Sequence, residues 1–165
     1  MIKIGVAERK DYLTIQQIAH QTWYPTFEKI LSKEQIAYML EMMYSLRAIE
    51  EQIEHKGHIF LLAKEEENCV GYASYETNYQ GTYKTKIHKI YVLPSAQGKG
   101  VGKILMDSIE KIAKEKGNKL LSLNVNRNNP AINFYEKIGF KKIRQEDIDI
   151  GKGFLMQDFI MEKNI

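Results

Sequence analysis

Glycine and lysine alternate in one short run of the sequence, Gln-Gly-Lys-Gly-Val-Gly-Lys over residues 97–103. A run of this kind lets a phosphate approach the backbone closely, because glycine has no Cβ to stand in the way. If a helix begins here, its first turn adds unpaired N–H groups and a partial positive charge. The run therefore predicts an anion-binding loop. The alternative is a flexible turn whose lysines are merely solvated.

Two familiar phosphate motifs can be tested against the run by counting. The P-loop needs a glycine where Gln97 stands, and a serine or threonine where Ile104 follows Lys103. The dinucleotide fingerprint counted from Gly98 needs a glycine at position 103, which is a lysine. Both motifs are excluded.

The pattern that fits is Gln-x-x-Gly-x-Gly, formed by Gln97, Gly100 and Gly102. Lys99 and Lys103 are four residues apart, so we expect them to share one helical face. Like charges at that spacing repel each other unless an anion lies between them. The loop thus favours a ligand with phosphate groups.

Hydrophobic periodicity predicts the elements that position this loop. Strands are expected over 2–7, 58–64, 69–76, 86–93, 120–125, about 140–148 and 153–162. Helices are expected over 11–23, from 32 to about 56 with an interruption near 45, from the glycine run to 117, and briefly after 129. This order indicates a mixed α/β layer fold with a connected sheet.

Polar residues mark where the expected helices begin. Asp11 and Asn129 stand at N-cap positions, and Ser32 with Gln35 has the spacing of a capping box. Pro130 suits the first position of the short helix.

The composition and net charge limit the classes of function that the protein can have. A chain of 165 residues with 27% charged residues and a net charge of +3 fits one globular domain, and the charge is too small for a dedicated nucleic-acid binder. Cys69 is the only cysteine and is expected to be a small buried residue. The start of the chain has no signal-peptide pattern, and no stretch approaches the ~20 apolar residues of a membrane span. We expect a cytoplasmic protein with no membrane or nucleic-acid partner.

Two longer stretches, IHKIYVLPSAQGKGVGKIL (residues 87–105) and NVNRNNPAINFYEKIGF (residues 124–140), carry a family resemblance. Together they resemble the GCN5-related N-acetyltransferase (GNAT) superfamily. The resemblance implies one N-acetyltransferase domain over residues 1–165, with a central twisted, mostly antiparallel sheet and helices on both faces. It also implies acetyl-CoA as the cofactor.

The resemblance assigns the cofactor site residue by residue. The backbone of the strand Ile90, Tyr91 and Val92 would pair with the pantetheine arm, and an N–H of this strand would polarise the acetyl carbonyl. The diphosphate would lie on the loop, and two asparagines would contact the cofactor beyond it. These residues are Gln97, Gly98, Lys99, Gly100, Val101, Gly102 and Lys103, then Asn128 and Asn129.

The resemblance assigns a general acid but leaves the general base open. Tyr135 matches the family tyrosine that contacts the cofactor and protonates the departing thiolate. Some members use a glutamate as base where this chain has Leu123, which cannot serve. Glu76 and His88 remain as candidate bases, either directly or through water, and no metal ion is expected.

The acceptor pocket is expected near an aromatic segment, TWYPTF at residues 22–27, read as a linker between two helices. Trp23, Tyr24 and Glu28 are the candidate substrate-binding residues, although the segment could equally be a staple that closes the core. Over its whole length the chain is also similar to the PaiA-type polyamine N-acetyltransferases. This similarity implies acetylation of a primary amine, such as one of spermidine or spermine. The carboxylates that could hold such a substrate are Glu28, Glu41, Glu76 and Asp158.

Three functional hypotheses stay open at this point. The first is acetyl transfer to a small amine by direct attack in a ternary complex. The second is acetylation of peptide or protein amines, at N-termini or lysines. The third is a non-catalytic acyl-CoA sensor that has kept the cofactor loop. The resemblance to the GNAT superfamily is also compatible with a homodimer.

Overall fold

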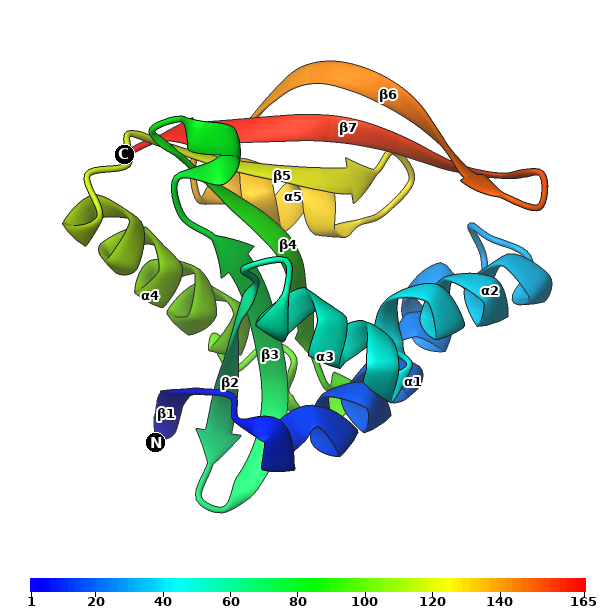
Figure 1. Ribbon diagram of the computed structural model, residues 1–165, viewed down its shortest axis with the longest axis horizontal. Coiled ribbons are helices and arrows are strands. Elements are labelled where there is room, and N and C mark those ends of the chain that lie inside the picture. Colours follow the sequence, from blue (N-terminus) through cyan, green and yellow to red (C-terminus); the bar gives the residue numbers. More distant parts are fainter.

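The computed structural model describes residues 1–165 and contains one seven-stranded sheet (Figure 1). Its order is β1-β2-β3-β4-β5-β7-β6, and every neighbouring pair is antiparallel except β4 with β5. The expected mostly antiparallel mixed sheet is confirmed. The strands are β1 (Ile2–Val6), β2 (Ile59–Glu65), β3 (Asn68–Glu76), β4 (Lys84–Val92), β5 (Leu120–Asn126), β6 (Lys141–Gly151) and β7 (Phe154–Asn164).

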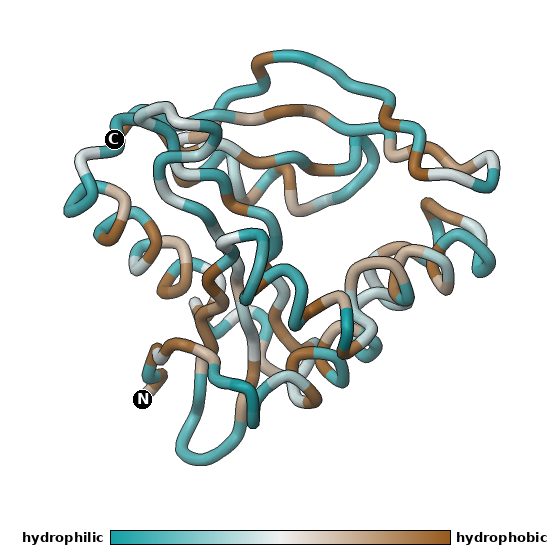
Figure 2. Tube along the Cα trace, viewed as in Figure 1, coloured by the Kyte–Doolittle hydropathy of each residue, from teal (hydrophilic) through white to brown (hydrophobic).

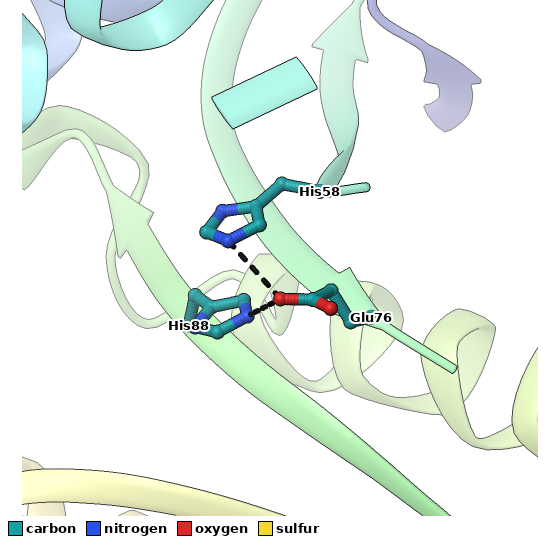
Figure 3. A group of neighbouring side chains, drawn as sticks. All are labelled: His58, Glu76 and His88. Atoms are coloured by element: carbon teal, nitrogen blue, oxygen red, sulfur yellow. Dashed lines mark hydrogen bonds and ion pairs between the residues drawn. The ribbon is translucent and has the colours of Figure 1, made fainter. Parts of the chain in front are cut away.

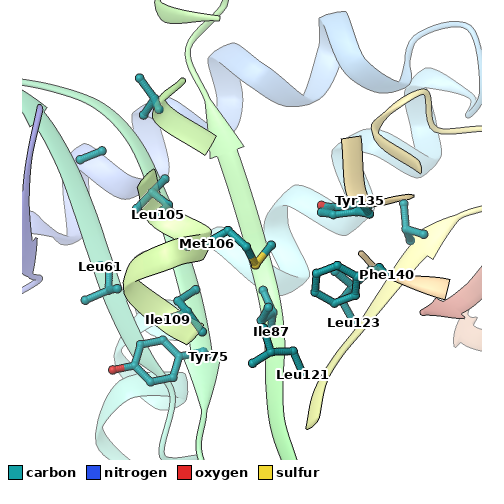
Figure 4. Close-up of a cluster of buried hydrophobic side chains, with 14 of the residues drawn as sticks. Leu61, Tyr75, Ile87, Leu105, Met106, Ile109, Leu121, Leu123, Tyr135 and Phe140 are labelled. Atoms are coloured by element: carbon teal, nitrogen blue, oxygen red, sulfur yellow. The ribbon is translucent and has the colours of Figure 1, made fainter. Parts of the chain in front are cut away.

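Helices cover both faces of the sheet. They are α1 (Tyr12–Phe27), α2 (Lys33–Tyr44), α3 (Leu46–Glu54), α4 (Val101–Glu115) and α5 (Ala131–Lys137). Strand β2 shows how the two faces arise: Phe60 and Leu62 pack with α1–α3, whereas Leu61 and Ala63 pack with α4 and α5. Successive side chains of a strand point to opposite faces, so one apolar strand supplies both cores. Figure 4 shows the α4 side.

The segment 22–27 is not a linker, as the sequence had suggested, but the last part of α1. Trp23 and Phe27 are four residues apart on one helical face and are only 3% and 5% exposed. Pro25 removes one helical hydrogen bond, but it lies in the final turn, where the interruption is mild. Burial of the two aromatic rings therefore outweighs the proline signal.

Serines divide the next helical region as expected. Ser32 Oγ accepts from the N–H of Gln35 at the start of α2, and Ser45 Oγ accepts from the N–H of Ala48 at the start of α3. The capping box at Ser32 is only half formed, because the Gln35 side chain donates to the carbonyl of Leu155 in β7 instead.

Asp11 does not cap α1 as expected. Its Oδ2 accepts from the N–H of Glu8, in the short 3₁₀ turn before the helix. Asn129 does act at its helix, because its Oδ1 accepts from the N–H of Ala131, the first residue of α5.

The edge strand β6 carries little apolar surface. Figure 2 colours most of it hydrophilic, and its side chains are mainly exposed. Charged edge strands of this kind resist pairing with other chains. No helix of the structure has both the length and the apolar character that crossing a bilayer requires.

Strands β4 and β5 pair only at one end and then separate (Figure 1). Their register runs from Lys84 opposite Leu120 to Ile87 opposite Leu123 and goes no further. On its other edge β4 contains a bulge at His88, because Tyr75 pairs with Ile87 and Ser74 pairs with Lys89. The second half of β4 therefore has one edge without a strand partner, and a bulge marks where the opening starts.

Candidate active site

A cavity of about 790 Å³ occupies the opening between β4 and β5. Its walls come from α1 and α2, both strands, the glycine loop, the start of α5 and β7. Ile90, Tyr91 and Val92 line it along the unpaired edge of β4. Elements distant in the sequence thus meet around one space large enough for an extended ligand.

The glycine loop presents an uninterrupted row of backbone donors. None of the six N–H groups from Gly98 to Lys103 donates to a protein acceptor, and the first bond of α4 is from Ile104 to the carbonyl of Gly100. Gly98 and Gly100 have φ angles of +80° and +78°, in the left-handed region that favours glycine. Such a row at the start of a 15-residue helix is suited to an oxyanion such as a diphosphate.

Gln97 ties this loop to β4. Its Nε2 donates to the carbonyl of Val92 at 3.2 Å, so the side chain braces the loop. Gly102 packs against Phe134 of α5, where an added Cβ would lie 3.6 Å from the ring.

The two loop lysines do not share a helical face, because α4 begins only at Val101. Lys99 pairs with Glu65 at 3.6 Å and does not line the cavity. Lys103 lines it and pairs with Asp107 at 2.7 Å. Of the two lysines expected to hold the anion, only Lys103 therefore lines the cavity.

The two candidate asparagines also differ. Asn129 lines the cavity, whereas Asn128 lies outside it and donates its backbone N–H to Oδ1 of Asn126.

Tyr135 lies in α5 and lines the cavity with only 7% of its surface exposed. Its ring centroid lies 5.9 Å from that of Phe140 (Figure 4) and 5.5 Å from that of Phe134. Burial raises the pKa of Tyr135, so the phenol keeps its proton at neutral pH and can donate it.

His88 and Glu76 form one hydrogen-bonded unit (Figure 3). His88 Nε2 lies 2.8 Å from Glu76 Oε1, and His58 Nε2 lies 3.1 Å from the same oxygen. Only His88 of the three lines the cavity. Burial lowers the pKa of both histidines and raises that of Glu76, so both rings are neutral at pH 7.

Three such donors could suggest a metal ion, since their ligand atoms lie within 4.8 Å of one another. The rings of His58 and His88 are stacked, however, with centroids 3.9 Å apart and planes at 6°. Both Nε2 atoms lie within hydrogen-bond distance of one oxygen, Glu76 Oε1, which can accept from two neutral imidazoles. The arrangement fits a carboxylate holding two neutral imidazoles.

The aromatic wall of the cavity comes from the end of α1. Trp23 lines it, with its ring centroid 4.6 Å from Phe27 and 5.9 Å from Tyr91. Tyr24 and Glu28 do not line it: they are exposed residues of this helical end. Tyr24 and Glu28 are four residues apart and therefore share one helical face, which is turned away from the cavity.

One carboxylate does face the cavity. Asp158 of β7 is 4% exposed, accepts from Asn124 Nδ2 at 3.3 Å, and has no basic nitrogen within ion-pair distance. Burial raises its pKa. Of the four carboxylates considered from sequence, Glu28, Glu41 and Glu76 do not line the cavity.

Lys89 of β4 lines the cavity and was not foreseen. It is 8% exposed, and its Nζ donates to Gln52 Oε1 at 2.8 Å and lies over the rings of Tyr44 and Phe60. Burial lowers the pKa of Lys89 to about 7, with Lys56 adding repulsion. The available signal was a lysine between Ile87 and Tyr91 in a strand expected to be buried.

The splayed strands, the row of free amides at a helix start and the cavity between them form a site suited to an extended ligand with phosphate groups. Comparison with known proteins gives the family. The Acetyltransferase (GNAT) family profile matches residues 15–140, and the chain belongs to this family of acetyltransferases. Its acetyl donor is acetyl-CoA.

Individual relatives match most of the chain. The spermidine N(1)-acetyltransferase of Thermoplasma acidophilum is 30% identical over 98% of this chain and 96% of its own. The ribosomal protein bS18-alanine N-acetyltransferase of Haemophilus influenzae is 31% identical over 78% of this chain and 80% of its own. The PaiA N-acetyltransferase of T. acidophilum, solved in complex with coenzyme A, superposes with a TM-score of 0.82 at 29% identity, covering 100% and 99% of the two chains.

Proposed function

We propose that this protein acetylates a primary amine of a polyamine such as spermidine, by direct attack of the amine on acetyl-CoA in a ternary complex. The observation that carries the proposal is Asp158, a buried carboxylate that lines the cavity with no ion-pair partner, since Lys86 and Arg127 act on it only from a longer distance. A buried charge is costly unless it is paired, so a cationic ligand is its natural complement. The 30% identity to a spermidine N(1)-acetyltransferase supports the same substrate class.

The cofactor is assigned to the loop and the unpaired edge of β4. The amides of residues 98–103 would hold the diphosphate, with Lys103 beside it. The backbone of Ile90–Val92 would pair with the pantetheine amides, and Asn129 would contact the cofactor beyond the loop. When bound, acetyl-CoA supplies an acetyl group activated as a thioester.

His88 and Glu76 are assigned to remove the proton of the incoming ammonium. An alkyl amine with a pKa near 10.4 is neutral in only about one molecule in 10³ at pH 7, so this proton must leave before attack. His88 reaches the cavity, and its Nε2 is hydrogen-bonded to Glu76. Burial lowers the pKa of His88, so the ring does not keep a proton taken by its other nitrogen and must pass it on to Glu76, whose pKa burial raises.

Tyr135 is assigned as the acid that protonates the departing thiolate. It is buried, lines the cavity and holds its proton firmly in the resting protein. Free phenols have pKa values near 10 and free thiols near 8.5, so transfer of this proton to the thiolate is uphill in the resting protein and depends on the phenol being hydrogen-bonded to the sulfur as the C–S bond breaks.

A second candidate function is acetylation of a peptide or protein amine. The 31% identity to a ribosomal-protein alanine acetyltransferase favours it. Leu123, which occupies the position of a glutamate base in such enzymes, argues against it.

The test is acetyl-CoA consumption by the full-length protein with three kinds of acceptor: spermidine and spermine, peptides with free N-termini, and peptides with internal lysines. Turnover of the polyamines with a higher kcat/KM than any peptide is expected. Turnover of peptides alone would overturn the polyamine assignment. Binding of CoA without turnover of any acceptor would favour the sensor hypothesis.

A further inference from the structure

Lys89 is the only lysine besides Lys103 that lines the cavity, and it lies one residue before the strand segment assigned to the pantetheine arm. No carboxylate is within ion-pair distance of its amine. The nearest polar partner is the neutral Gln52 side chain, at 2.8 Å. Lys89 thus borders the space assigned to the acetyl donor, while its amine is held at the edge of that space by Gln52, which does not line the cavity.

We propose that Lys89 is a self-acetylation site, modified by the acetyl-CoA bound in its own cavity. This inference rests on the acetyl-CoA site assigned above under the proposed function. The Nζ lone pair attacks the thioester carbonyl, so an N–C bond forms and the C–S bond breaks. The sulfur leaves as a thiolate, and the proton lost by the nitrogen ends on that sulfur to give free coenzyme A.

The surroundings of Lys89 favour the reactant form of this amine. Burial lowers its pKa to about 7, so a large share of the side chains is uncharged without help from any base. The side chain must leave Gln52 to react, and its four-carbon stem gives it the freedom to do so.

The same surroundings favour the product. Acetylation removes a charge that has no counter-charge in the protein, yet it leaves one N–H that can still donate to Gln52. The added methyl group would lie near the rings of Tyr44 and Phe60, which already flank Nζ.

Lys86 is a matched internal control in the same strand. Burial also lowers its pKa, to about 8, but Lys86 does not line the cavity and donates to Asn124 instead. If basicity alone governed the reaction, both lysines would be modified. If the cavity governs it, only Lys89 will be.

The experiment incubates the full chain with acetyl-CoA and no acceptor, then digests it with trypsin for mass spectrometry. Acetylated Lys89 resists cleavage, so the peptide Ile87–Lys99 appears with one added acetyl group; acetylation of Lys86 would instead give Thr85–Lys89. We expect Lys89 to react roughly tenfold faster than Lys86, and faster than Lys89 in urea-unfolded chain, because the folded cavity holds both reactants together. Lys89→Arg should abolish the Ile87–Lys99 product, and saturating spermidine should slow its formation.

Equal modification of Lys86 and Lys89, or acetyl groups only on exposed lysines, would overturn the inference. Coenzyme A binding and spermidine turnover are measured on the same preparation. If both are present while Lys89 stays unmodified, the self-acetylation is wrong and the proposed function stands. If coenzyme A does not bind, both are wrong.

Discussion

Replacing Asp158 by asparagine tests the acceptor assignment most directly. The side chain keeps its shape and can still accept from Asn124, so the change removes the charge and little else. Asp158 is 4% exposed and lies against the cavity, where water screens a charge weakly. A substrate ammonium at this site should therefore lose a charged partner that no other carboxylate of the cavity replaces.

The size of the effect follows from the hydrogen bond that is lost. A hydrogen bond between charged groups contributes about 1.5–3 kcal/mol, and about 1.4 kcal/mol corresponds to a factor of ten. We expect kcat/KM for spermidine to fall roughly 10- to 150-fold, mainly through KM. For n-butylamine, which has only the reacting amine, the fall should be within a factor of about three if Asp158 holds a second ammonium.

The assay follows release of the coenzyme A thiol with both amines at several concentrations. Asp149→Asn is the control, because Asp149 is an exposed residue of the same hairpin whose amide variant can still accept from the N–H of Gly151. Equal losses for spermidine and n-butylamine would place Asp158 at the reacting amine or in the fold. No loss with either amine would refute its role in acceptor binding.

Tyr135→Phe should lower kcat roughly 10²-fold while calorimetry still detects coenzyme A binding; an unchanged kcat would remove Tyr135 as the acid. His88→Gln should lower kcat most below pH 8 and less at high pH, where free amine is abundant, and a uniform loss at all pH values would contradict its role as base. Gly100→Ala, at φ +78°, should cost about 1–2 kcal/mol in stability and weaken coenzyme A binding; an unchanged Tm and affinity would refute the loop argument. Lys89→Met should unfold at a higher temperature than the natural chain at pH 7. Because the folded pKa of Lys89 is depressed to about 7, its penalty is present below that pH and fades as pH rises to the unfolded value, so the gain should shrink by pH 10. A gain that is the same at pH 7 and pH 10 would refute the assignment.

Much of the fold depends on interactions between residues that are close in the sequence, and such interactions can be predicted from the sequence. Serine caps at Ser32 and Ser45 and glycines such as Gly100 act on their own neighbours, so the beginning of α2, the break before α3 and the loop before α4 follow from a few residues each. The segment 22–27 was misread as a linker, because its helical state depends on contacts with residues far away in the sequence. The burial of Trp23 and Phe27 keeps α1 helical through this segment.

The same division holds at the candidate site. The spacing of the glycine loop predicts an anion-binding loop, and the row of free amides that would serve it is a direct consequence of the local conformation. Which side chains face the cavity is not local. Tyr24 and Trp23 are adjacent in sequence, yet only Trp23 faces inward, because the direction of a helix face is set by what it packs against.

The sequence by itself determined the order of the elements, the position of the glycine loop before α4, and the family. Only the tertiary structure decided that Asp158 is the carboxylate in the cavity, that His88 is bonded to Glu76 beneath a stacked His58, and that Lys89 is buried without a counter-charge. These groups come from separate strands. They meet because of the strand order and the point where β4 and β5 part, which depend on contacts distributed over the whole sheet.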